Sequence, residues 1–146
     1  MSEEKVILLI EDNPSDAALT KRALEKKKNH DKIVVAEDGE IALNYLFGIA
    51  GNHKQIPAKL PTVIFLDLKL PKISGIEVLQ RIRSDPRTKR IPVVVLTSSL
   101  EDIDLIASYD LGANSYVRKP VDYAGFADTI ASIGMYWLTL NESPPK

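Results

Sequence analysis

The sequence has no cysteine, few aromatic residues and no excess of charge of either sign. Without cysteine, the 146-residue chain has no disulfide, no thiolate metal site, no iron–sulfur cluster and no cysteine nucleophile. Its 19 basic and 20 acidic residues give a formal net charge of -1. No global basic field therefore attracts nucleic acid or an anionic membrane.

Long hydrophobic runs are also missing. The apolar runs Val6–Ile10 and Val63–Leu66 are far shorter than the ~20 residues that a membrane-spanning helix needs. The amino-terminal residues are acidic and lead directly into a strand pattern, which is unlike a signal peptide. We therefore expect a protein of the cytoplasm, with no membrane partner and no direct nucleic-acid partner.

Short apolar runs alternate with helical patterns five times along the chain. Continuous runs rich in Val, Ile and Leu are typical of strands covered on both faces, and apolar residues three to four positions apart predict helices. The predicted strands are residues 6–10, 33–36, 63–66, 93–96 and 115–117. The first predicted helix begins with an N-cap at Ser15 or Asp16. The next three cover residues 39–47, 75–84 and 101–109, and the last begins at about residue 122. This alternation predicts an α/β domain with an open parallel sheet and helices on both faces.

Two segments depart from a minimal alternation of this kind. Residues 48–61 form a polar stretch longer than the usual connection of about 2–6 residues, and we expect a surface excursion near the second helix. We expect residues 139–146 to form a frayed tail. We expect residues 1–146 to be a single domain with its core at about 5–138 and no output domain.

The last helical pattern has two apolar faces. Phe126, Ile130, Ile133 and Trp137 form the stripe that packs on the core. Three further apolar residues lie off that stripe and are expected to be partly exposed, namely Met135, Tyr136 and Leu138. A second apolar face of this kind indicates a contact surface.

Residues able to do chemistry follow four of the predicted strands. Glu11 and Asp12 follow the first, Asp67 the third, Thr97 the fourth and Lys119 the fifth. Because the carboxyl ends of parallel strands meet at one sheet edge, we expect these side chains to cluster. Clustered carboxylates repel each other, and a hard cation such as Mg²⁺ relieves that repulsion. A carboxylate there can attack a phosphoryl group, with the hydroxyl and the ammonium contacting phosphoryl oxygens.

Each of these residues taken alone would be a helix cap, a turn residue or a solvated side chain, so the interpretation depends on the joint pattern. The whole set resembles the receiver domain of two-component response regulators over residues 5 to about 138. The matching runs are Leu8-Leu9-Ile10-Glu11-Asp12-Asn13, Phe65-Leu66-Asp67-Leu68, Leu70-Pro71 with Gly75, Val95-Leu96-Thr97-Ser98, Gly112-Ala113 and Val117-Arg118-Lys119-Pro120. The resemblance implies a flavodoxin-like (βα)5 fold with strand order 2-1-3-4-5.

The resemblance implies a metal site and a phosphoacceptor at matching positions. It makes Asp67 the phosphoacceptor. It assigns Mg²⁺ to Asp12, Asp67 and the main-chain carbonyl of Lys69, with Glu11 binding directly or through water. We expect the Lys69 side chain to lean toward the mouth of this site, with the small Ser99 leaving the other side open.

The resemblance also implies a switch. It makes Thr97 the switch hydroxyl, Lys119 the phosphate-contacting lysine and Tyr116 the aromatic switch residue. Read by itself, Tyr116 is a surface tyrosine of an edge strand. The family pattern further implies a cis peptide bond between Lys119 and Pro120.

The function implied is a phosphorylation switch rather than an enzyme acting on other substrates. A sensor histidine kinase donates a phosphoryl group to Asp67, and the face formed by the fourth helix, fifth strand and fifth helix changes shape. We expect a homodimer through that face. A narrower resemblance, carried by the long loop and the run from Asp67 to Pro71, is to stand-alone response regulators that serve phytochrome-type histidine kinases.

Two other functions stay open from the sequence. One is a Mg²⁺-dependent phosphatase with an aspartyl-phosphate intermediate, which Lys69 disfavours because that chemistry requires an acid at this position. The other is an interaction module that works without phosphorylation. The complete set of acidic residues, Thr97 and Lys119 disfavours this module.

Overall fold

Five parallel strands form one sheet in the structure, a computed structural model that describes residues 5–25, 31–48 and 59–145. The strands are β1 (Val6–Ile10), β2 (Lys32–Ala36), β3 (Val63–Leu66), β4 (Val93–Thr97) and β5 (Ser115–Arg118). Their order across the sheet is β2-β1-β3-β4-β5, and every neighbouring pair is parallel. The predicted flavodoxin-like fold is thereby confirmed.

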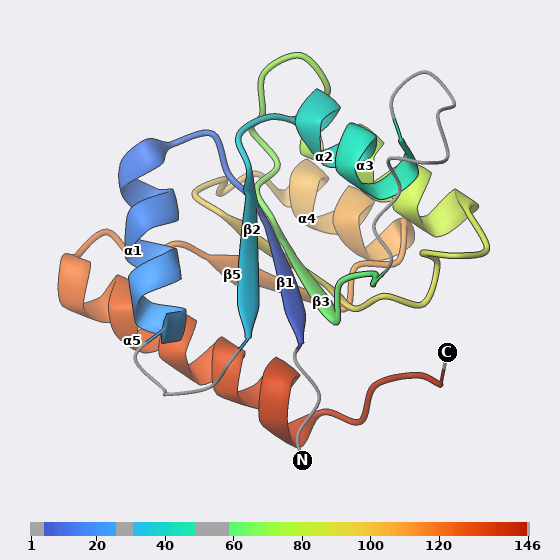
Figure 1. The fold of residues 1–146 in the computed structure, drawn as a ribbon. Helices are drawn as coiled ribbons and strands as arrows, with labels where there is room; N and C mark the ends of the chain where they lie inside the picture. Colours follow the sequence, from blue (N-terminus) through green and yellow to red (C-terminus); the bar gives the residue numbers. More distant parts are fainter. Residues whose placement is uncertain (1–4, 26–30, 49–58, 146) are drawn as a thin grey trace.

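Helices cover both faces of the sheet. They are α1 (Pro14–Glu25), α2 (Gly39–Phe47), α3 (Gly75–Ser84), α4 (Asp102–Asp110) and α5 (Tyr123–Met135), which continues as the π-helix η3 (Tyr136–Leu140). Figure 1 shows α1 and α5 on one side of the sheet and α2, α3 and α4 on the other. Successive side chains of a strand point to opposite faces, so Ile7 and Leu9 pack toward α1 and α5, whereas Leu8 and Ile10 pack toward α2 and α3.

Helix α1 begins earlier than the sequence indicated. Its first residue is Pro14, and the N-cap is Asn13 rather than Ser15 or Asp16. The Asn13 side-chain oxygen accepts a hydrogen bond from the Asp16 N–H at 3.1 Å, and its carbonyl accepts one from Ala17 at 2.9 Å. A proline is favoured at a first helical position, because the N–H that it lacks would have no partner there. The Asp16 carboxylate is therefore not used as a cap.

The end of the last helix also differs from the expectation. Met135 and Tyr136 are exposed as predicted, but Leu138 is only 6% exposed, and Trp137 is half-buried. The change to a π-helix at Tyr136 puts an extra residue into the turn and shifts the apolar face by one position. The helix therefore extends into the predicted tail, as far as Leu140.

Three further expectations concern the peptide bond before Pro120, the excursion at residues 48–61 and membrane-spanning helices. The described residues contain no cis peptide bond, so the bond before Pro120 is trans and the cis expectation was wrong. Trans is the ordinary preference of a bond before proline. Most of the predicted excursion at 48–61 lies outside the described residues. No helix in the described parts of the chain is both long and apolar enough to cross a membrane.

Arg83 ties the connections around β4 together. Its guanidinium donates hydrogen bonds to the carbonyls of Lys89, Ile91 and Gly112 at 3.0, 2.8 and 2.9 Å, and to the Asn114 side chain at 2.8 Å. The Asn114 side-chain oxygen also accepts from the Val93 N–H at 2.8 Å. Arg83 thus fixes the loops that lead into β4 and β5.

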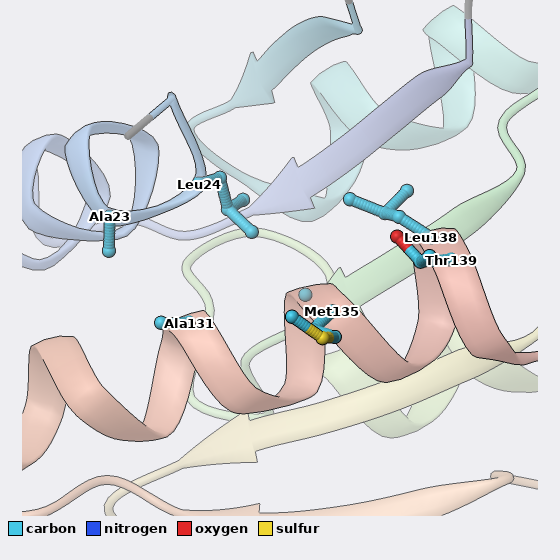
Figure 2. Close-up of a pocket in the computed structure, with 7 residues that line it drawn as sticks. Ala23, Leu24, Ala131, Met135, Leu138 and Thr139 are labelled. Carbon is cyan, nitrogen blue, oxygen red and sulfur yellow. The ribbon is translucent and has the colours of Figure 1, made fainter. Parts of the chain in front are cut away.

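Helices α1 and α5 approach each other closely near their carboxyl ends. Figure 2 shows Ala23 and Leu24 of α1 facing Ala131 and Met135 of α5. These residues line a cavity of about 20 Å³. A Cβ on Gly134 would lie 2.7 Å from a Leu24 methyl carbon. That methyl is the end of a flexible side chain and borders the cavity, so it has room to move.

Gly75 is required where α3 begins beside the end of β3. Its N–H donates to the Leu68 carbonyl at 3.0 Å, and an added Cβ would overlap the Asp67 carbonyl oxygen and lie 2.6 Å from the Leu68 Cα. We predict that Gly75→Ala lowers the free energy of unfolding by about 3 kcal/mol or more, because backbone atoms have to move.

Gly134→Ala is the matched control for this prediction. The gain of about 0.5–1 kcal/mol from replacing a glycine inside a helix offsets the small shift of Leu24. Its free energy of unfolding should stay within about 1 kcal/mol of the unmodified protein. Urea denaturation measures the free energy of unfolding of both variants. Equal decreases in the two variants would contradict the proposed role of the backbone at Gly75.

Candidate functional site

An acidic cluster lies at the carboxyl edge of the central strands. Glu11 and Asp12 follow β1, and Asp67 follows β3. Oxygen atoms of the three carboxylates lie within 4.8 Å of one another. Glu11 and Asp67 are buried, whereas Asp12 is exposed. Carboxylate oxygens at this spacing, with one open side, suit a hard divalent cation.

The Lys119 ammonium lies against this cluster. It is 2.6 Å from the nearest Glu11 oxygen, 2.9 Å from an Asp16 oxygen and 3.0 Å from an Asp67 oxygen. The lysine side chain is only 8% exposed. Since an ammonium has three N–H donors, each of the three can point at a different carboxylate.

Burial and neighbouring charges shift the pKa values of Lys119 and Glu11. Burial lowers the pKa of Lys119, but the hydrogen bonds to Glu11 and Asp16 and the charges of Asp67 and Glu11 outweigh it, so its pKa is raised. Burial raises the pKa of Glu11 to about 7, helped by the Asp67 charge and opposed by Lys119. Lys119 is therefore cationic at neutral pH, while Glu11 is poised to exchange a proton there.

Backbone groups around the cluster point at its carboxylates. The Lys69 N–H donates to one Asp67 oxygen at 3.3 Å, and the Asn13 N–H donates to Glu11 at 3.2 Å. Asp67 thus uses one carboxylate oxygen for a backbone donor and the other for the Lys119 ammonium. The two contacts hold the plane of the carboxylate in a defined orientation.

The two predicted switch residues lie on the neighbouring strands. Thr97 is fully buried at the end of β4, where its hydroxyl oxygen accepts a hydrogen bond from the Ser99 N–H at 3.3 Å. Tyr116 is half-buried on β5 and packs against the core on the α2 and α3 side. Its hydroxyl is buried and has no hydrogen-bond partner among the described residues. The reading of Tyr116 as a surface tyrosine is therefore wrong.

Two site residues were missed by the sequence interpretation. Asp16 contacts Lys119, and its place in the first turn of α1, close in sequence to Glu11 and Asp12, was a usable signal. Asp104 of α4 accepts a hydrogen bond from the Ser99 hydroxyl at 2.6 Å and pairs with the Lys69 ammonium at 3.8 Å. No sequence pattern marks that contact. The Lys69 side chain is 65% exposed and lies toward α4.

Comparison with protein families identifies the class to which this fold and site belong. The response regulator receiver domain family matches residues 7–131. The chain belongs to this family, whose members interact with sensor histidine kinases. The resemblance drawn from the strand-end motifs is thereby confirmed.

The similar proteins include regulators of phytochrome signalling. Response regulator Rcp1 of Synechocystis is 39% identical over 94% of this chain and 95% of its own length. The probable methanogenesis regulatory protein FilR2 of Methanothrix harundinacea is 42% identical over 95% of this chain and 87% of its own. The phosphorylated cyanobacterial phytochrome response regulator RcpA superposes with a TM-score of 0.91, at 38% identity, over 98% of this chain and all of its own.

A metal-bound relative bears on the acidic cluster. The crystal structure of Mn²⁺-bound Rcp1 matches with a TM-score of 0.89, at 38% identity, over 97% of this chain and 99% of that chain. Together with the spacing of Glu11, Asp12 and Asp67, this similarity supports a divalent cation at the cluster.

Proton uptake by Glu11 makes stability depend on pH. Its folded pKa of about 7 lies above the ordinary value of 4.5, so the folded state binds this proton more tightly than the unfolded state. The resulting stabilisation is complete below the ordinary value and is lost as the pH rises through the folded value. We predict that this loss lowers the free energy of unfolding in EDTA by about 2 kcal/mol between about pH 5 and about pH 8.

Glu11→Gln is the control, because it has no proton to lose. Between about pH 5 and about pH 8, urea denaturation should show that the free energy of unfolding of Glu11→Gln falls by about 2 kcal/mol less than that of the unmodified protein. Identical pH profiles of the two proteins would contradict the assignment of the raised pKa to Glu11.

Proposed function

We propose that this protein is a phosphoacceptor response regulator in which Asp67 takes a phosphoryl group from the phosphohistidine of a sensor kinase. The observation that carries the proposal is the surroundings of Asp67. One of its oxygens lies 3.0 Å from the Lys119 ammonium, and the cluster it forms with Glu11 and Asp12 suits a divalent cation. We further propose that this cation is Mg²⁺, held by the three carboxylates and the main-chain carbonyl of Lys69.

The transfer is an in-line displacement at phosphorus. An Asp67 oxygen forms the new bond to phosphorus while the bond from phosphorus to the histidine nitrogen breaks, and the imidazole leaves with that electron pair. Lys119 remains charged at neutral pH and stabilises the phosphoryl oxygens. The Lys69 N–H holds the carboxylate in place. When bound, Mg²⁺ neutralises charge on the phosphoryl oxygens.

The proposed switch uses the two residues beside the site. The new charge on Asp67 draws the Thr97 hydroxyl toward the phosphoryl group, and Tyr116 follows. The Tyr116 hydroxyl, which has no hydrogen-bond partner in the described part of the chain, supports this proposal, because a buried hydroxyl without a hydrogen bond costs about 1–3 kcal/mol. A residue with that cost is easily biased between two positions by a local charge.

The proposal predicts a single phosphorylation site. Incubation with acetyl phosphate and Mg²⁺ should add one phosphoryl group, and Asp67→Asn should remain unlabelled because an amide does not form the acyl phosphate. Intact-protein mass spectrometry measures the gain. Asp12→Asn is the matched control for loss of charge, and it should slow labelling without abolishing the acceptor. Full labelling of Asp67→Asn would overturn the assignment.

We propose a phytochrome-type histidine kinase as the donor, supported by the similarity to RcpA and Rcp1. Phosphotransfer from a panel of the host's histidine kinases tests this part separately. Selective transfer from a kinase of another type would refute the choice of donor and leave the role of Asp67 intact.

We also propose a homodimer through α4, β5 and α5. Exposed apolar side chains gather in α4 and just before it, where Leu100, Ile103 and Ile106 are 75%, 75% and 60% exposed. Tyr136, directly after α5, is also exposed. Apolar side chains presented this way favour a protein contact.

The dimer proposal predicts that Ile103→Glu shifts the protein toward monomer, because a charge in an apolar contact has to be desolvated. Sedimentation velocity over a range of concentrations measures the change, and about a tenfold weaker association is expected. Ile41→Glu is the matched control, since Ile41 is an exposed residue of α2. A monomeric unmodified protein, or equal effects of the two variants, would refute the proposed face.

A further inference from the structure

The Lys119 ammonium has a third acidic partner that is not part of the acidic cluster. Its contacts to Glu11 and Asp67 involve two carboxylates of the cluster at which a divalent cation fits. The contact to Asp16, at 2.9 Å, involves a carboxylate outside that cluster. Asp16 therefore approaches the ammonium from α1 rather than from the carboxyl end of a strand.

The position of Asp16 is fixed by its own helix. Its N–H donates to the Asn13 side chain at 3.1 Å, and its carbonyl accepts a hydrogen bond from the Thr20 hydroxyl at 2.7 Å. Pro14, the first residue of the same turn, has its own φ fixed by its ring. The first turn of α1 is thus a firm support for the carboxylate.

The three partners of the ammonium differ in what happens to them during phosphoryl transfer. Glu11 and Asp67 would hold a cation at the cluster with some of their oxygens, and its positive charge would repel the ammonium. Phosphorylation then removes the negative charge of the Asp67 carboxylate. Asp16 takes part in neither event, so its contact with Lys119 is the one that can persist throughout.

We propose that Asp16 is a positioning residue, which holds the Lys119 ammonium beside the phosphoryl group by a contact outside the cation cluster. The inference rests on the proposed function of Asp67. Without Asp16, the ammonium has only carboxylates that the cation engages, and it loses its fixed position when the cation binds. Asp16 thereby also couples the first turn of α1 to Lys119 at the end of β5.

A purely structural role makes a different prediction. An acid in the first turn of a helix interacts favourably with the helix dipole, so its loss would lower stability without changing ligand binding. A simple charge effect predicts the opposite sign, because removal of a negative charge favours binding of an anion. The affinity for an anionic phosphoryl mimic therefore separates the three explanations.

The test is a calorimetric titration with beryllofluoride at saturating Mg²⁺. Asp16→Asn should bind about tenfold more weakly than the unmodified protein, as expected for the loss of a charge-assisted hydrogen bond. Asp16→Glu restores the carboxylate and should bind within about threefold of the unmodified protein. Glu37→Gln removes a charge from an exposed residue after β2, at the same sheet edge, and should bind no more weakly.

A double-mutant cycle with Lys119→Met shows whether Asp16 acts through the ammonium. In that background Asp16→Asn should cause no further loss of affinity. Unchanged or tighter binding by Asp16→Asn, or a full tenfold loss that persists in the Lys119→Met background, would overturn the role of Asp16. Failure of the unmodified protein to bind beryllofluoride would instead refute the proposed function, and the inference with it.

Discussion

The contact of one buried ammonium with three carboxylates is the interaction on which this site depends. Lys119 comes from the end of β5, and its partners Glu11, Asp16 and Asp67 come from the end of β1, from α1 and from the end of β3. Buried carboxylates so close together destabilise a fold unless a positive charge compensates them. The same ammonium satisfies that need and, in the proposed function, is the donor for phosphoryl oxygens. The Lys119 side chain therefore stabilises the fold and also takes part in the proposed phosphoryl transfer.

The backbone around the sheet edge holds these charges in place. The close approach of α3 to the end of β3 requires the absence of a side chain at Gly75, and the resulting turn brings the Lys69 N–H to Asp67. At the opposite edge of the sheet, the Arg83 guanidinium fixes the connections that lead into the amino ends of β4 and β5. The strand ends are thus positioned by contacts that lie outside the acidic cluster.

A chain of polar contacts leads from the site toward α4. The Thr97 hydroxyl oxygen accepts from the Ser99 N–H, the Ser99 hydroxyl donates to Asp104, and Asp104 pairs with Lys69 beside Asp67. The first turn of α4 is therefore connected to residues two positions after both Asp67 and Thr97. These contacts connect the surroundings of Asp67 with the helix that presents the exposed apolar side chains.

The sequence by itself determined the five βα units, the sheet edge that carries the chemistry, and the grouping of Glu11, Asp12, Asp67 and Lys119. These follow from local periodicity and from the rule that parallel strands end at one edge. Only the tertiary structure decided that Asp16 faces Lys119 and that Leu138 rather than Trp137 is buried. Such features depend on contacts between residues far apart in the chain and on a local change of helix type. Neither leaves a periodic pattern in the sequence, because each is settled by the space and charge that other elements provide.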